Sequence, residues 1–175
     1  ASFPSYVLAG FKKHNRHGAE ASLKYVLFGA ASAAVMAYGL SLLYGIYGTL
    51  QLEQFSLVSV EGNGALLAVA LGAVGVGVAF KIAAVPFHFW CPDVFEGSSV
   101  DVAAFLSVAS KGAAIVLLLR IVMTLAHGVG YSPDAPGLSL DLIALVIGMV
   151  GAVTATLGNT AALRQTNLKR LLAYS

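Results

Sequence analysis

Charged side chains are scarce in this 175-residue chain, where Asp, Glu, Lys and Arg make up 10% of residues and hydrophobic residues make up 58%. A soluble domain usually carries about 25% charged residues. The composition therefore excludes an ordinary soluble domain and indicates an integral membrane protein. The 10 basic and 8 acidic residues leave a net charge of only +2 and occur in short clusters, so we expect no nucleic-acid partner.

Cysteine is nearly absent as well. The single Cys91 excludes a disulfide within the chain and offers no second thiolate for a zinc or iron–sulfur site. The chain begins without an initiator methionine or a cleavable leader, and it stops at Ser175 soon after a new apolar segment has begun. We expect residues 1–175 to form a single membrane domain that is a fragment of a longer protein.

Long apolar runs, by contrast, fill most of the chain. Crossing about 30 Å of hydrocarbon takes about 20 helical residues, and backbone groups in lipid must be hydrogen-bonded internally. The sequence therefore predicts an all-α, polytopic transmembrane helix bundle with about four complete spans and two partial ones. The complete spans are predicted at residues 20–47, 64–90, 100–126 and 139–163, and the partial ones at 1–11 and 166–175.

The connections between spans predict an orientation. Loops 10–18 and 164–170 carry the basic residues Lys12, Lys13, Arg16, Arg164, Lys169 and Arg170. Loops 48–63 and 127–138 carry Glu or Asp and no Lys or Arg. By the positive-inside rule, the two basic loops face the cytoplasm or an equivalent compartment.

One connection departs from this pattern. Residues 91–99, "CPDVFEGSS", are predicted to form a loop on the basic side and yet are acidic. This indicates a protein contact or a functional surface, with chance composition as the alternative. Phe87, Phe89 and Trp90, just before it, are expected at the membrane interface. The glycines Gly72, Gly75 and Gly77 are expected to let helices pack closely.

Two lysines lie inside predicted spans, where a charge at the bilayer centre costs about 2.5–3.5 kcal/mol. Lys111 lies close to the middle of the span 100–126, and Lys81 lies past the middle of 64–90. The stem of Lys81 could carry its ammonium toward the interface. Lysines at similar depth on consecutive helices instead favour the bundle interior.

Pro86 lies five residues after Lys81. Its ring removes the hydrogen bond to the carbonyl of Ile82, so we expect the span to break near Pro86, just after Lys81. Broken helices are tolerated at membrane depth where they line a protein-buried or water-filled cavity. A lysine whose pKa is set by its neighbours can carry protons, and Lys81 and Lys111 are therefore candidates for a proton relay.

Three further residues are candidates for the same relay. Glu20 and Lys24 have the i, i+4 spacing of a helical ion pair; they form either an interfacial structural pair or part of the relay. His88, at the mouth of the predicted break, could exchange protons near neutral pH. The alternative for His88 is a hydrogen-bonded interfacial residue.

Three stretches in order, "FKIAAVPFHFWCPDVFEG", "FLSVASK" and "LRQTNLKRLLAYS", resemble the antiporter-like membrane subunits of respiratory complex I, and the resemblance covers essentially the whole chain. The "PFHFWCPDVFEG" stretch and the lysine of "ASK" favour the branch of subunit N of NADH-quinone oxidoreductase. The resemblance implies a proton-translocating subunit of the membrane arm. In it, Lys81 matches the lysine of a broken helix, and Lys111 matches the next relay lysine.

The resemblance also implies what this chain does not hold. Glu20 and Lys24 match charged residues of the preceding helix, and the family's glutamate partner of Lys81 would stand just upstream of Ala1. NADH, FMN, iron–sulfur clusters and quinone belong to other subunits, so no cofactor or metal is expected on this chain. The expected partners are other membrane-arm subunits of complex I and the lipid bilayer. The alternatives are a subunit of a cation/proton antiporter or membrane-bound hydrogenase, and a structural membrane scaffold.

Overall fold

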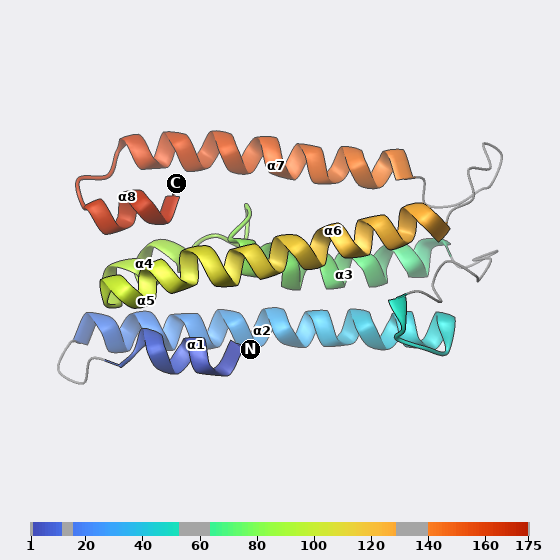
Figure 1. The fold of residues 1–175 in the computed structure, drawn as a ribbon, viewed down its shortest axis with the longest axis horizontal. Helices are drawn as coiled ribbons and strands as arrows, with labels where there is room; N and C mark the ends of the chain where they lie inside the picture. Colours follow the sequence, from blue (N-terminus) through green and yellow to red (C-terminus); the bar gives the residue numbers. More distant parts are fainter. Residues whose placement is uncertain (1, 12–15, 53–63, 129–139, 175) are drawn as a thin grey trace.

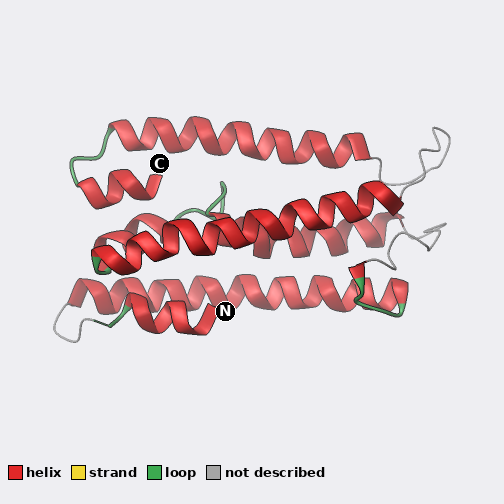
Figure 2. Ribbon diagram, viewed as in Figure 1, coloured by secondary structure: helices red, strands yellow, loops and turns green. Residues whose placement is uncertain are grey.

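The computed structural model describes residues 2–11, 16–52, 64–128 and 140–174. Every regular element among these residues is helical (Figure 2), as predicted. The elements are α1 Ser2–Ala9, α2 Arg16–Tyr47, α3 Gly64–Ile82, α4 Trp90–Gly97, α5 Val100–Phe105, the π-helical segment η2 Leu106–Ser110, α6 Lys111–Gly128, α7 Leu140–Leu163 and α8 Leu168–Tyr174.

Four helical stretches are long and apolar enough to cross a membrane. They are Gly18–Tyr47, Gly64–Ile82, Val100–Leu125 and Asp141–Leu163. They run along one common direction (Figure 1), and the short helices α1 and α8 contact α2 and α7 respectively. The predicted polytopic bundle is confirmed, and the chain is an integral membrane protein. The second span differs in that its helix ends at Ile82 rather than at residue 90.

The connections that were predicted to lie on one side of the membrane lie at one end of the bundle. The start of α2, the junction of α4 with α5, and the connection from α7 to α8 lie at the same end, on the left of Figure 1. Lys12 and Lys13 lie outside the described residues, as do Glu53, Glu61 and Asp134 of the predicted acidic loops. The orientation of this end relative to the membrane therefore stays a prediction.

Helices α2 and α3 pack most extensively, and small residues allow their approach. A Cβ atom at Gly77 would lie 2.6 Å from the sulfur of Met36 on α2, and one at Gly39 would lie 2.7 Å from the carbonyl oxygen of Ala70 on α3. Gly77 thus has the predicted packing role. Gly72 and Gly75 face open space within the described part of the chain.

A hydrophobic core, separate from the contact of α2 with α3, lies where the second span breaks. It brings together side chains from α1, α2, α3, α4, α5, η2 and α8, including Tyr25, Phe80, Trp90, Phe95 and Leu106. By contrast, no residue in the most apolar stretch of α7 is buried. The break is therefore the point at which the short helices meet the spanning ones.

Candidate functional site

The second span breaks directly after Lys81. Helix α3 ends at Ile82, residues 83–89 form turns, and α4 begins at Trp90. Pro86 lies in this segment, four residues after Ile82, and has no N–H to donate to the Ile82 carbonyl. The Val85–Pro86 peptide bond is cis. The predicted break near Pro86 is confirmed.

A second feature, a residue in the left-handed conformation, ends α3 before Pro86. Ala83 has a φ of 62°, its N–H donates to the Phe80 carbonyl at 3.1 Å, and the N–H of Ala84 donates to the Ala79 carbonyl at 2.9 Å. This pair of hydrogen bonds is a Schellman motif, which glycine usually occupies at the left-handed position. Because residue 83 is alanine rather than glycine, the sequence gives no sign of this motif.

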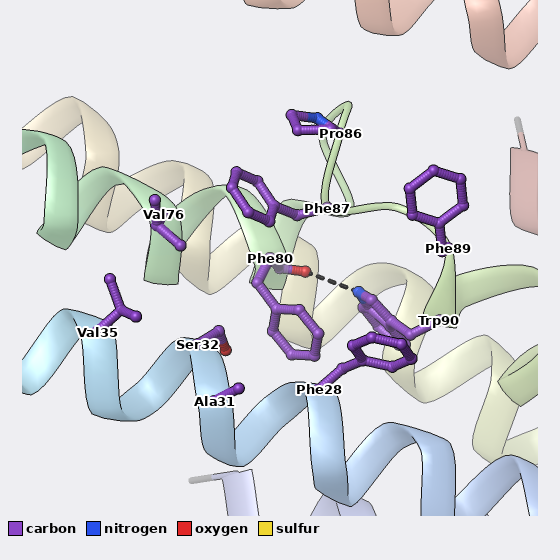
Figure 3. A pocket seen from close by; sticks show the side chains of 10 residues that line it. All are labelled: Phe28, Ala31, Ser32, Val35, Val76, Phe80, Pro86, Phe87, Phe89 and Trp90. Carbon is purple, nitrogen blue, oxygen red and sulfur yellow. Dashed lines mark hydrogen bonds between the residues drawn. The ribbon is translucent and has the colours of Figure 1, made fainter.

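Two hydrogen bonds then fix the broken segment. The indole N–H of Trp90 donates to the Phe80 carbonyl at 3.0 Å, joining α4 to the end of α3 (Figure 3). The backbone N–H of Val85 donates to the hydroxyl of Thr154 on α7 at 3.0 Å. Trp90 is only 3% exposed, so it faces the protein core rather than lipid, and its N–H has a buried carbonyl partner.

Lys81 lies among aromatic rings of α1 and α2. Its Nζ is 5.6 Å from the ring centroid of Tyr6 and 5.9 Å from that of Tyr25, within the range of cation–π attraction. Tyr25 is fully buried and stacks on Trp90 at 4.5 Å between centroids. Among the described residues, no carboxylate forms an ion pair with Lys81. Its ammonium therefore lies on the bundle interior side of α3.

Lys111 faces a different set of groups. It follows the π-helical segment Leu106–Ser110, and its Nζ is 5.7 Å from the ring centroid of Phe95 on α4. It also lines a cavity of about 240 Å³ between the break, α4, α6, α7 and α8. The cavity is lined by Ile82, Ala83, Val85, His88, Cys91, Pro92, Lys111, Thr154, Gly158, Ala173 and Tyr174.

His88 shares this cavity with Lys111, and its Nδ1 is buried with no hydrogen-bond partner among the described residues. A buried ring nitrogen without a partner is costly unless water or a proton-bearing group reaches it. The cavity has room for several water molecules, since each occupies about 30 Å³ in the liquid. Lys81 is not among the residues that line it.

A separate pocket of about 320 Å³ lies between α2, α3 and the broken segment (Figure 3). Its lining is almost wholly apolar, and the hydroxyl of Ser32 is already bonded to the Gly29 carbonyl at 3.0 Å. It is lined by Phe28, Ala31, Ser32, Val35, Val76, Phe80, Pro86, Phe87, Phe89 and Trp90. No titratable side chain lines it, in contrast to the cavity that Lys111 and His88 line.

Residues 91–97 of the acidic stretch belong to the helix α4, Trp90–Gly97, so the predicted loop is wrong for these residues. Pro92 lies in the first turn of this helix, where a missing N–H costs little. Asp93 pairs with Lys24 of α2 at 3.0 Å and with Arg170 of α8 at 2.8 Å. Lys24 also pairs with Glu20 at 2.9 Å, and Arg170 pairs with Glu96 at 2.9 Å.

This ion-pair network explains the acidic exception on the basic side. Burial alone would raise the pKa of the Asp93 carboxyl, but hydrogen bonds from Lys24 and Arg170 outweigh burial and hold the pKa below its ordinary value. The hydrogen bond to Asp93 raises the pKa of Arg170. Glu20 and Lys24 form an ion pair that extends through Asp93 to α4 and Arg170 of α8, and both alternatives for the two residues, a structural pair and a part of the relay, are compatible with it.

The structure thus brings some predicted residues together and separates others. His88 and Lys111 share a cavity, and Glu20 and Lys24 pair, whereas Lys81 faces Tyr6 and Tyr25. Sequence reasoning missed these two tyrosines, Asp93 as a partner of Lys24, and Thr154. None of these contacts has a local signal, because each joins segments that are far apart in the sequence.

The whole chain, residues 1–175, matches the family model described as the transmembrane region of the NADH:quinone oxidoreductase/Mrp antiporter family. It is 45% identical to NADH-quinone oxidoreductase subunit N of Anaeromyxobacter sp. (strain Fw109-5), covering 99% of this chain and 36% of that protein. It is 47% identical to NAD(P)H-quinone oxidoreductase subunit 2 of Synechococcus sp. (strain WH7803), covering 99% of this chain and 31% of that protein. The chain spans about a third of the length of these relatives.

Solved structures give the same match. A chain of respiratory complex I from Thermus thermophilus with bound Aureothin is 39% identical, with a TM-score of 0.76 over 99% of this chain and 34% of that one. A chain of the Mrp complex from Dietzia sp. DQ12-45-1b is 25% identical, with a TM-score of 0.79 over 98% of this chain and 30% of that one.

Proposed function

This chain belongs to the NADH:quinone oxidoreductase/Mrp antiporter family, and we propose that it is part of a proton-translocating, N-type membrane-arm subunit of NADH-quinone oxidoreductase. In this proposal the chain holds no redox site. Quinone reduction and NADH oxidation take place in other subunits, and the partners of this chain are other membrane-arm subunits and lipid. The membrane is the bacterial inner membrane, with the basic segments 10–18 and 164–170 on the cytoplasmic side.

One observation carries the proposal: the spanning helix α3 opens directly after Lys81, beside a cavity that Lys111 and His88 line. Lysines at membrane depth are expensive and are kept where they serve an ion or proton path. An opened helix exposes carbonyl groups that can bind water or an ammonium. Lys81 and Lys111 therefore have the surroundings of proton carriers rather than of lipid-facing anchors.

In the proposed mechanism, each lysine holds a proton until its surroundings change. The rings of Tyr6 and Tyr25 stabilise Lys81 while it is charged. Water in the cavity carries protons between Lys111 and His88, because an imidazole ring can both donate and accept a proton. Glu20 and Lys24, joined to Asp93 at the basic end, supply paired charges near the same end of the bundle.

The test is Lys81→Met in the complete complex. Met has a similar length and no charge, so we expect proton pumping coupled to quinone reduction to fall about tenfold or more, with assembly intact. The matched control is Arg120→Met, which removes an exposed charge from α6 and is expected to pump normally. Wild-type pumping in the Lys81 variant would remove Lys81 from the relay.

A second candidate is a subunit of a cation/proton antiporter, which the similarity to the Mrp chain favours. The same helices would then work without a redox arm. Purifying the full-length protein under mild conditions separates the two, because only the first candidate copurifies with NADH-oxidising subunits. A structural scaffold is the remaining alternative, and it predicts normal pumping in the Lys81 variant.

A further inference from the structure

The N–H of Val85 is the group that would continue helix α3. In an α-helix this N–H would donate to the carbonyl four residues earlier, which is that of Lys81. In this structure it donates to the Thr154 hydroxyl at 3.0 Å. The next residue, Pro86, has no N–H for the carbonyl of Ile82. Two successive carbonyls at the end of α3 thus lack their helical donors. The N–H that would bond the Lys81 carbonyl bonds Thr154 instead, and the residue that would bond the Ile82 carbonyl is a proline without an N–H.

Thr154 is held in place for this contact. Its hydroxyl donates to the Val150 carbonyl of its own helix at 2.6 Å, and a hydroxyl that donates one bond still has lone pairs to accept another. The loop of the break projects toward α7 (Figure 1). The N–H of Val85 in this loop therefore reaches the oxygen of the Thr154 hydroxyl. Its position on α7 is thus fixed by the helix that carries it.

Two other threonines of α7 show that this contact is specific. Thr156 and Thr160 have exposed side chains, and their hydroxyls donate at 2.8 Å to the carbonyls of Ala152 and Thr156 respectively. Both therefore make the same backward bond within the helix that Thr154 makes. Of the three, Thr154 is the one whose hydroxyl also accepts a bond from another element.

The contact lies in the wall of the cavity beside Lys111. Thr154, Val85 and Ile82 all line this cavity, as do Lys111 and His88. If the N–H of Val85 returned to the Lys81 carbonyl, α3 would lengthen at the expense of the break. We propose that Thr154 is a positioning residue for proton transfer, whose hydroxyl keeps α3 open and so preserves the cavity. This inference rests on the proposed proton translocation.

The experiment compares Thr154→Val with Thr156→Val in the complete complex. Val keeps the shape of Thr and removes the hydroxyl, so T154V leaves the N–H of Val85 without its partner. We expect the amide hydrogen exchange of the segment around Val85 to change by about threefold or more in T154V and to stay unchanged in T156V. We expect protons pumped per quinone reduced to fall several-fold in T154V, and Thr154→Ser to restore both quantities.

The outcomes separate this inference from the proposed function. Unchanged exchange around Val85 in T154V would overturn the contact itself, and changed exchange with normal pumping would overturn its role in proton transfer. Normal pumping in Lys81→Met would instead overturn the proposed function, whatever the exchange result. If T154V does not assemble, Thr154→Ala provides the same loss of hydroxyl with less crowding at the helix contact.

Discussion

At the residue scale, Asp93 is the carboxylate on which charges from two other helices converge. It pairs with Lys24 of α2 and Arg170 of α8 while lying on α4 itself. Its side chain is 29% exposed, so each pair is partly screened by solvent and modest in energy. The value of the arrangement lies in its geometry, because one carboxylate fixes the positions of two helices.

The pH dependence of this contact follows from the pKa of Asp93, which lies below its ordinary value of 3.8. A lowered pKa contributes stability above the ordinary value, and this contribution is lost as the pH falls through the folded pKa. We therefore expect the attachment of α8 to α4 to be constant from pH 5 to 8 and to loosen below about pH 4. Hydrogen exchange of residues 168–174, measured against pH, checks this expectation.

The matched pair of variants for that measurement is Asp93→Asn and Asp101→Asn. D93N removes the charge at every pH, so exchange in residues 168–174 should be about threefold faster than in the wild type at neutral pH. Asp101 is exposed at the start of α5, and D101N should leave exchange unchanged. Equal exchange in D93N and the wild type would show that the ion pairs do not hold α8.

At the scale of elements, α3 and α4 are joined by Trp90. Its indole donates to the Phe80 carbonyl, and its ring packs against those of Tyr25 and Phe80 at centroid distances of 4.5 and 5.1 Å. The residue before it, Phe89, is 68% exposed. Two adjacent aromatic residues therefore have opposite roles, which allows a paired test.

We expect Trp90→Phe to destabilise the protein by about 1–3 kcal/mol, because it leaves the Phe80 carbonyl without its indole donor and opens space in the core. Phe89→Leu should change stability by no more than about 0.5 kcal/mol. Thermal unfolding of the purified full-length protein in detergent measures both. A W90F variant as stable as F89L would mean that the indole hydrogen bond does not hold the two helices together.

The limits of an element could be predicted from the sequence where one nearby residue sets them. Pro86 removes one N–H, and a break just after Lys81 followed directly. The loop expected at residues 91–99 is instead largely the helix α4, in which Pro92 lies in the first turn, where proline is tolerated. The π-helical segment before Lys111 has no signal in "LSVAS".

At the scale of the whole molecule, the spans were predictable and their neighbours were not. A run of apolar residues fixes that a helix crosses the bilayer, but a helix that is apolar on every side does not indicate which face meets a partner. Helix α7 illustrates this limit: its extent was predicted, whereas its contact through Thr154 with the broken segment depends on tertiary structure. The ion pairs of Asp93 were missed for the same reason.

The orientation of the bundle gives the last prediction. Thr166, between α7 and α8, is exposed at the end of the bundle that carries the basic residues, and Leu50, after α2, is 52% exposed at the other end. The native Cys91 is only 1% exposed, so it should add little background to thiol labelling. By the positive-inside rule, Thr166→Cys should react with a membrane-impermeant maleimide only in inverted vesicles, and Leu50→Cys only in intact, right-side-out ones. The opposite labelling pattern would place the ion-pair network of Asp93 on the outer side and reverse the proposed orientation.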